Sequence, residues 1–168
     1  MKFQFYYEKL VASDEFQNFK RENPGAYPCS GFFVLDKEKD GKENHINFDY
    51  YLPQYKKMFS FKVTGGPVEK IQIENVDPRV PEKLGMNYTF DLYEIEKKIN
   101  AKMAEEKIKG NMQKILFSLQ KLDGVDYLVI TVFLSNMGLL KVHYDITEDK
   151  IVHFEKKSFL DMFKILKK

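Results

Sequence analysis

The sequence is poor in the residues that build disulfides and that read nucleic acids. Cys29 is its only cysteine, so no intrachain disulfide framework can form, and a reducing, cytoplasmic location is expected. Arg21 and Arg79 are its only arginines, and the rest of the 27 basic residues are lysines. Specific contacts to phosphate and guanine favour the planar guanidinium group. The scarcity of arginine therefore argues against a sequence-specific nucleic-acid partner.

Long apolar runs are also missing. A membrane-spanning helix needs about 20 consecutive apolar residues, whereas the longest run, residues 128–134, has the length of a strand. The first residues lack the long apolar stretch of a secretory signal. The 27 basic residues are balanced by 25 acidic ones that are interspersed along the chain, which is typical of a solvated surface. We therefore expect neither a membrane nor a polyanion as partner.

No motif of catalysis or nucleotide binding is present. Gly65 and Gly66 are not followed by the Lys-Ser or Lys-Thr pair of a phosphate-binding loop. The segment 135–138 lacks the flanking pattern of a nucleophile elbow. Cys29 comes just before a predicted strand, where a buried, unreactive thiol is the common case. The sequence therefore favours a non-enzymatic protein without a cofactor.

Apolar and aromatic residues, in contrast, are abundant. Hydrophobic residues make up 43% of the chain, with 15 Phe and 10 Tyr, which is enough for a substantial core. A length of 168 residues lies within the usual size of one domain. We therefore predict a single α+β domain over residues 1–168.

Alternating apolar residues and turn residues predict the strands, and capping residues predict the helices. The predicted strands cover residues 2–7, 31–35, 45–52, 57–63, 68–74, 128–134, 140–146 and 150–155. The predicted helices cover residues 14–22, a long segment from Asp91 to about Lys121 with a bend or break near 104–111, and a terminal segment from Ser158 whose apolar face is Phe159, Phe163 and Leu166.

These elements predict an α+β fold in the order β-α-β-β-β-β-α(α)-β-β-β-α, because the strands come in antiparallel runs that do not alternate with helices. Segments 31–35 and 128–134 are apolar on both faces, so we expect them at the centre of an antiparallel sheet of about 7–8 strands with helices on one face. Residues 30–74 are expected to form a meander with one buried face, with Ile71 and Ile73 on the same face of its last strand. The element order resembles that of secretion-chaperone-like α+β domains, a resemblance that assigns no functional residue.

The alternation of the last two strands predicts how they pair. A register with the turn centred on Glu148 puts the apolar residues of both strands on one face and pairs His143 with His153. Their Cβ atoms would then lie about 5 Å apart. Two such imidazoles can ligate a divalent metal, with Glu155 or Asp145 as an oxygen ligand. The alternative is a solvated histidine pair on a hairpin, because a metal site needs further ligands and supporting partners.

A cluster of aromatic residues within segment 48–61 suggests a second candidate site. Half of the cluster falls on the inward face and is expected in the core, whereas Tyr51 and Tyr55 are expected outward or in the turn. Together with Lys56 and Lys57 they predict a recognition patch for a peptide or a stacked base. The alternative is that they are ordinary exposed tyrosines.

Three functions are compatible with these features. The leading one is a non-enzymatic binding module for a protein or peptide partner, with a homodimer as one arrangement. The second is a metal-dependent hydrolase or metal-binding protein that uses the histidine pair. The third is a carrier of a small apolar ligand, whose pocket would be lined by Phe59, Phe61, Ile115 and Leu119.

Overall fold

The computed structural model describes residues 1–38, 40–74, 77–158, 160–161 and 164. Its helices are α1 Phe3–Ala12, α2 Asp14–Glu22, the short 3-10 helix η1 Pro53–Tyr55, and α3 Leu92–Glu105. Its strands are β1 Tyr27–Asp36, β2 His45–Leu52, β3 Lys57–Lys62, β4 Glu69–Ile73, β5 Met112–Leu122, β6 Val125–Leu134, β7 Gly138–Asp145 and β8 Lys150–Ser158. None of the helices in these ranges is both long and apolar enough to span a membrane.

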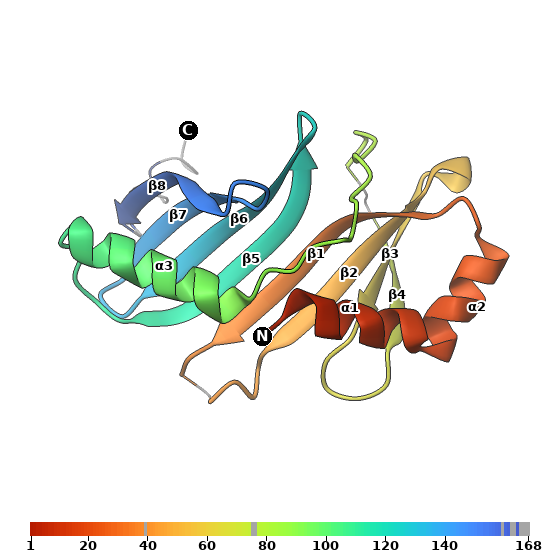
Figure 1. The fold of residues 1–168 in the computed structure, drawn as a ribbon, viewed down its shortest axis with the longest axis horizontal. Coiled ribbons are helices and arrows are strands. Elements are labelled where there is room, and N and C mark those ends of the chain that lie inside the picture. Colours follow the sequence, from red (N-terminus) through yellow and green to blue (C-terminus); the bar gives the residue numbers. More distant parts are fainter. Residues whose placement is uncertain (39, 75–76, 159, 162–163, 165–168) are drawn as a thin grey trace.

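All eight described strands form one antiparallel sheet in the order β4-β3-β2-β1-β5-β6-β7-β8. Strands β1–β4 form one meander and β5–β8 a second, and the pairing of β1 with β5 joins them. Each meander follows its own helical segment and runs outward from the centre, so the two halves share one topology (Figure 1). The predicted α+β class, the antiparallel sheet and the central positions of 31–35 and 128–134 are confirmed.

The helices lie on one face of the sheet (Figure 1). Phe3 of α1 packs against Phe48 of β2 with 5.6 Å between ring centroids, and Phe19 of α2 packs against Phe61 of β3 at 5.0 Å. Ile95 of α3 belongs to the same buried cluster. One continuous core therefore lies between the helices and the sheet, as the sequence predicted for helices on one face.

An extended segment, residues 84–90, also packs on the helical face and leads into α3. Leu84, Met86 and Tyr88 alternate as buried residues, and the Tyr88 ring lies 5.3 Å from that of Phe3. The backbone N–H of Phe3 donates to the carbonyl oxygen of Phe90 at 3.2 Å. The long connector is therefore part of the core layer and lies against α1.

Residues 3–7 are helical, so the predicted edge strand over residues 2–7 is wrong; Lys2 alone forms an isolated antiparallel bridge, with Asp91. The alternation that predicted it is short, whereas helical spacing fits the whole of α1. Phe3, Tyr6, Tyr7 and Leu10 follow the i, i+3, i+4, i+7 pattern, and each is buried in the core or packs against it. The helix ends at Ala12, and the hydroxyl of the next residue, Ser13, accepts from the backbone N–H of Phe16 and caps α2 as predicted.

The second half of the predicted long helix is strand β5. The break near 104–111 is confirmed, because α3 ends at Glu105. Residues 112–122 satisfy both periods, since Met112, Ile115, Leu119 and Leu122 have helical spacing while Ile115, Phe117 and Leu119 alternate. The Asp-Gly turn at 123–124 decides for the strand, because both residues have positive φ, at 51° and 78°, as a tight hairpin requires.

Two further expectations concern the ends of the meanders. Ile71 and Ile73 lie on the same face of β4, yet that face is opposite to the helices, and Ile71 is 52% exposed. At the terminal segment, the Ser158 hydroxyl accepts from the backbone N–H of Asp161 at 3.2 Å, as in a helix cap. The predicted apolar face of Phe159, Phe163 and Leu166 lies outside the described residues.

Substitution of a core residue of β5 tests this architecture. Phe117 is fully buried, so Phe117→Ala should lower the free energy of unfolding by about 3–5 kcal/mol in urea denaturation. Ile71→Ala is the matched control, and its effect should stay within about 0.5 kcal/mol because the side chain is exposed. Equal effects of the two variants would contradict the assignment of faces.

Candidate functional site

The face of the sheet opposite to the helices is the candidate binding surface, here called the open face. Successive side chains of a strand point to opposite faces, so the residues between the core positions of each strand lie on the open face. Six apolar residues occupy its centre and form what we call the apolar band: Phe32 and Val34 on β1, Leu116 on β5, Val129 and Phe133 on β6, and Leu139 on β7.

The strand register brings the members of the apolar band close together, with the polar Thr131 opposite Leu116 and Phe133 diagonal to it across β5 and β6. Val34 pairs with Leu116 across β1 and β5, and Phe133 pairs with Leu139 across β6 and β7. Val34 and Leu139 are only 3% and 2% exposed. The other four members are half-buried, namely Phe32, Leu116, Val129 and Phe133. The band is thus an apolar surface that no helix among the described residues covers.

A row of polar side chains flanks the band on the first meander. The Ser30 hydroxyl donates to Asp49 Oδ2 at 2.6 Å, and the Asn47 amide donates to the Ser60 hydroxyl at 3.3 Å. Burial raises the pKa of the Asp49 carboxyl, although hydrogen bonds from Ser30 and Ser60 act in the opposite direction. This row gives the open face specific hydrogen-bonding groups beside its apolar centre.

The histidine pair lies at the other side of the open face. His143 pairs with His153 as predicted, and Lys141 pairs with Glu155, with 5.1 Å between the imidazole centroids. His153 Nε2 lies 3.5 Å from Glu155 Oε2. Burial and the nearby His153 lower the pKa of His143. Asp145 lies beyond a bulge and accepts from the backbone N–H of Glu148 at 2.9 Å.

The structure brings His143, His153 and Glu155 to one place without building a metal centre around them. In the described ranges, no three or more His, Cys, Asp or Glu side chains are grouped so that they could hold a metal ion. Asp145 is engaged in the β7–β8 turn and does not join the pair. The metal-binding hypothesis therefore gains no support from this geometry.

The predicted tyrosine patch is only partly assembled. Tyr51 points away from the helices but is only 4% exposed, because Tyr27 packs against it at 5.7 Å and the Tyr27 hydroxyl donates to the carbonyl oxygen of Pro81. The expected exposure of Tyr51 is therefore wrong. Tyr55 is 59% exposed in η1, and Lys56 and Lys57 follow it as exposed residues. These three residues form a surface turn without Tyr51.

The expected pocket for an apolar ligand falls inside the core. Phe61, Ile115 and Leu119 are all fully buried, and Phe59 packs against the same cluster. Aromatic rings fill the space beside them, since the Phe19 ring lies 5.1 Å from that of Phe59. These side chains therefore contact other core residues, and the carrier hypothesis gains no support from them.

The single thiol is also unsuited to nucleophilic chemistry. Cys29 is 4% exposed at the start of β1. Burial raises the pKa of its thiol to about 12, with the Asp49 carboxyl acting in the same direction. Because the thiolate is the nucleophilic form, a thiol held protonated is unreactive near neutral pH.

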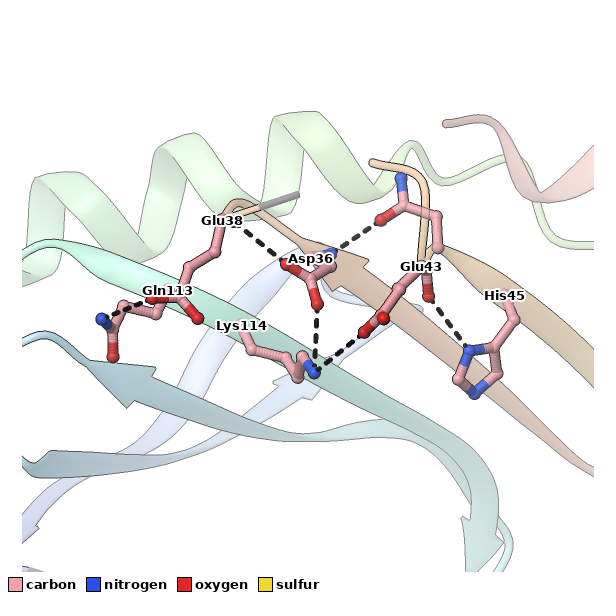
Figure 2. A network of polar contacts seen from close by, with 7 residues as sticks. Asp36, Glu38, Glu43, His45, Gln113 and Lys114 are labelled. Atoms are coloured by element: carbon pink, nitrogen blue, oxygen red, sulfur yellow. Dashed lines mark hydrogen bonds and ion pairs between the residues drawn. The ribbon is translucent and has the colours of Figure 1, made fainter. Parts of the chain in front are cut away.

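A polar network orders the end of the open face where β1 turns into β2 (Figure 2). Lys114 Nζ lies 3.0 Å from Asp36 Oδ2 and 4.0 Å from Glu43 Oε2. Asp36 also accepts from the backbone N–H of Glu38 at 3.0 Å, and its own N–H donates to Asn44 Oδ1 at 2.7 Å. The β1–β2 turn is thereby attached to β5 through the Lys114 ammonium.

A cavity of about 520 Å³ lies beside this network, between the β1–β2 and β3–β4 turns. We call it the lysine pocket. Its lining consists of Val34, Lys42, Glu43, Asn44, His45, Asn47, Lys62, Thr64, Gly65 and Lys114. The walls are thus formed by polar and basic side chains, with Val34 as the apolar member.

Sequence analysis missed the open face and the lysine pocket. The signal for the first was present, since segments 31–35 and 128–134 are apolar on both faces. We interpreted this pattern as burial from two sides, whereas the helices cover only one. Because residues 112–121 were assigned to a helix, Leu116 and Lys114 were not placed on a strand. The pocket depends on the register between β1 and β5, which no sequence motif predicts.

Loss of the Lys114 ammonium should destabilise the protein. The Asp36 side chain is 2% exposed, so its carboxylate depends on nearby donors and cations. Lys114→Met should lower the free energy of unfolding by about 1–3 kcal/mol in urea denaturation. Lys141→Met removes an exposed lysine of the same face and should change it by less than about 0.5 kcal/mol. Equal free energies of unfolding for Lys114→Met and Lys141→Met would contradict the stabilising role of Lys114.

The histidine pair should make stability depend on pH. Because the folded state lowers the pKa of His143 below 6.5, it binds a proton less readily than the unfolded chain does. The free energy of unfolding should therefore fall as the pH is lowered through about 6.5. In NMR titration, His143 should titrate below 6.5 and shift upward in His153→Gln, which removes a like charge. Titration at or above 6.5 in the parent protein would contradict this.

Comparison with known proteins gives a likeness of fold. No protein-family model matches the sequence, and no curated protein matches it. The crystal structure of a putative lipoprotein from Clostridium difficile 630 is similar, with a TM-score of 0.52 and 14% identical residues over 86% of this chain and 91% of that one. At this identity the likeness concerns the architecture, which the two proteins share along most of their length.

Proposed function

We propose that this chain is a non-enzymatic binding protein that docks a folded protein partner on the open face of its sheet. The observation that carries the proposal is the apolar band. It spans four neighbouring strands at the centre of a face that no described helix covers. Four of the six band residues are partly accessible to solvent, and apolar surface that a soluble protein leaves accessible marks interaction sites.

The size of the open face favours a protein over a small ligand. Eight strands about 4.8 Å apart make a face about 34 Å wide. The face is about 26 Å long along β1, β2 and β5–β8, which have at least eight residues each, and about 16–20 Å long along the shorter β3 and β4. This corresponds to roughly 800 Å². A stable protein interface buries about 800 Å² on each partner. The open face therefore matches one side of a standard protein interface.

The distribution of residues on the face also favours a protein partner. Protein interfaces combine an apolar centre with a polar rim. Here the apolar band is flanked by Ser30 and Asp49 on one side and by Lys141, His143 and Glu155 on the other. The band is spread over the surface of the sheet and is not folded into an enclosed cavity, unlike a site for a small apolar ligand.

The proposal includes a cytoplasmic location, which the single cysteine supports. It also includes the absence of catalysis, which is supported by the buried, protonated Cys29 thiol. The partner is a different protein in this proposal. A second copy of the chain is the competing occupant, and the oligomeric state distinguishes the two.

Site-specific photo-crosslinking tests the docking face. Benzoylphenylalanine placed at Phe133, or separately at Phe32, in the cells that produce the protein should give a discrete adduct of higher mass, because both positions lie in the apolar band. The same probe at Tyr93, which is 44% exposed on α3, is the matched control and should give none. Leu116→Lys should abolish the Phe133 adduct by placing a charge in the apolar band.

The outcomes separate the alternatives. An adduct of twice the chain mass, with a dimer in sedimentation that Leu116→Lys converts to a monomer, would identify a second copy as the occupant. Equal labelling from Tyr93 and Phe133, or no adduct from either band position, would contradict docking on the open face.

A further inference from the structure

We propose that the lysine pocket is an anchor for a carboxylate side chain, Asp or Glu, of the protein that docks on the open face. This rests on the proposed function. The pocket and the apolar band are continuous, because Val34 belongs to both. Lys114, which lines the pocket, sits directly beside Phe133 of the band in the sheet register. A partner on the band therefore reaches the pocket without leaving the surface.

The charges in the pocket favour an anion. Lys42, Lys62 and Lys114 contribute ammonium groups, and Glu43 is the single carboxylate of the lining. Lys114 is held by Asp36 and Glu43 at one wall, as Figure 2 shows. Lys42 and Lys62, in contrast, form no ion pair with any carboxylate of the described residues. The lining thus has positive charge that the described chain does not compensate.

The pocket also has hydrogen-bonding groups that suit a peptide segment. Asn47 Oδ1 is buried and has no donor among the described residues, while its amide nitrogen donates to Ser60. The Thr64 hydroxyl accepts from the backbone N–H of Ile46 at 3.1 Å, which leaves its own O–H to donate. A carboxylate in the pocket would accept from the Thr64 O–H while it meets the Lys62 ammonium.

Nucleic-acid and lipid phosphates fit less well. The pocket contains lysines and no arginine, so it lacks the planar fork that binds phosphate through two parallel hydrogen bonds. The adjoining surface is the apolar band, which suits a protein and not a phosphate backbone. Electrostatic contacts of this kind set the orientation of a partner more than the strength of binding. The anchor would therefore fix how the partner lies on the sheet.

NMR titration of the labelled protein tests the anchor with a defined probe. An acetylated and amidated tetraglutamate peptide should shift the backbone signals of Val34, Asn47, Lys62 and Thr64. Lys62→Met should raise its Kd by at least about three-fold, the effect of an exposed ion pair. Lys97→Met removes a lysine of α3 whose side chain is 71% exposed, away from the open face, and should leave the Kd unchanged. Raising NaCl from low to high concentration should weaken binding.

Other results would overturn the anchor. These are equal shifts with a tetraglutamine peptide, the same shifts with inorganic phosphate at equal concentration, displacement of the peptide by duplex DNA or by anionic vesicles, or shifts confined to residues outside the pocket. The crosslink from Phe133 tests docking on the open face independently of the peptide titration. If that crosslink forms while tetraglutamate leaves the pocket signals unmoved, the anchor is wrong and open-face docking stands. If no crosslink forms from the band, docking on the open face fails whatever the peptide does.

Discussion

The pairing of β1 with β5 is the interaction on which the rest of the structure depends. Six cross-strand pairs, from Gly31–Leu119 to Asp36–Lys114, join two meanders that otherwise have separate turns and separate outer edges. On one face this junction places Phe33 beside Phe117 in the core. On the other it places Val34 beside Leu116, so the apolar band extends across the two halves. Without the junction neither surface would exist.

The described helices cover only one of these two faces. They bury the aromatic face of the sheet and leave the opposite face uncovered, although the central strands are apolar on both sides. Neighbouring side chains on the open face bury part of the apolar band, as the low exposure of Val34 and Leu139 shows. A surface that is apolar at its centre and ordered at its border by the Asp36–Lys114 pair is well suited to recognition by shape.

Sequence alone was sufficient where one period dominates. The alternation of residues 140–155 predicted the contact of His143 with His153, and Ser13 marked the start of α2. It failed where two periods compete, as in residues 112–122, and where a short alternation lies inside a longer helical pattern, as at Phe3–Leu10. The open face was beyond its reach, because apolar residues on both sides of a strand do not reveal which side a helix will cover. Tyr51 shows the converse, since the Tyr27 ring of the neighbouring strand β1 packs on a residue that alternation places outward.

The central junction also has a consequence for how the chain folds. The hairpins within each meander close over short turns, whereas β1 and β5 are separated by roughly half the chain, so their pairing must meet a larger entropic cost of loop closure. We expect each meander to form first and the two to join late. Until they join, the hydrogen-bonding edges of β1 and β5 are both exposed and bordered by apolar side chains on either face. The strand edges most prone to aggregation in the folding chain are therefore those that lie at the centre of the finished sheet.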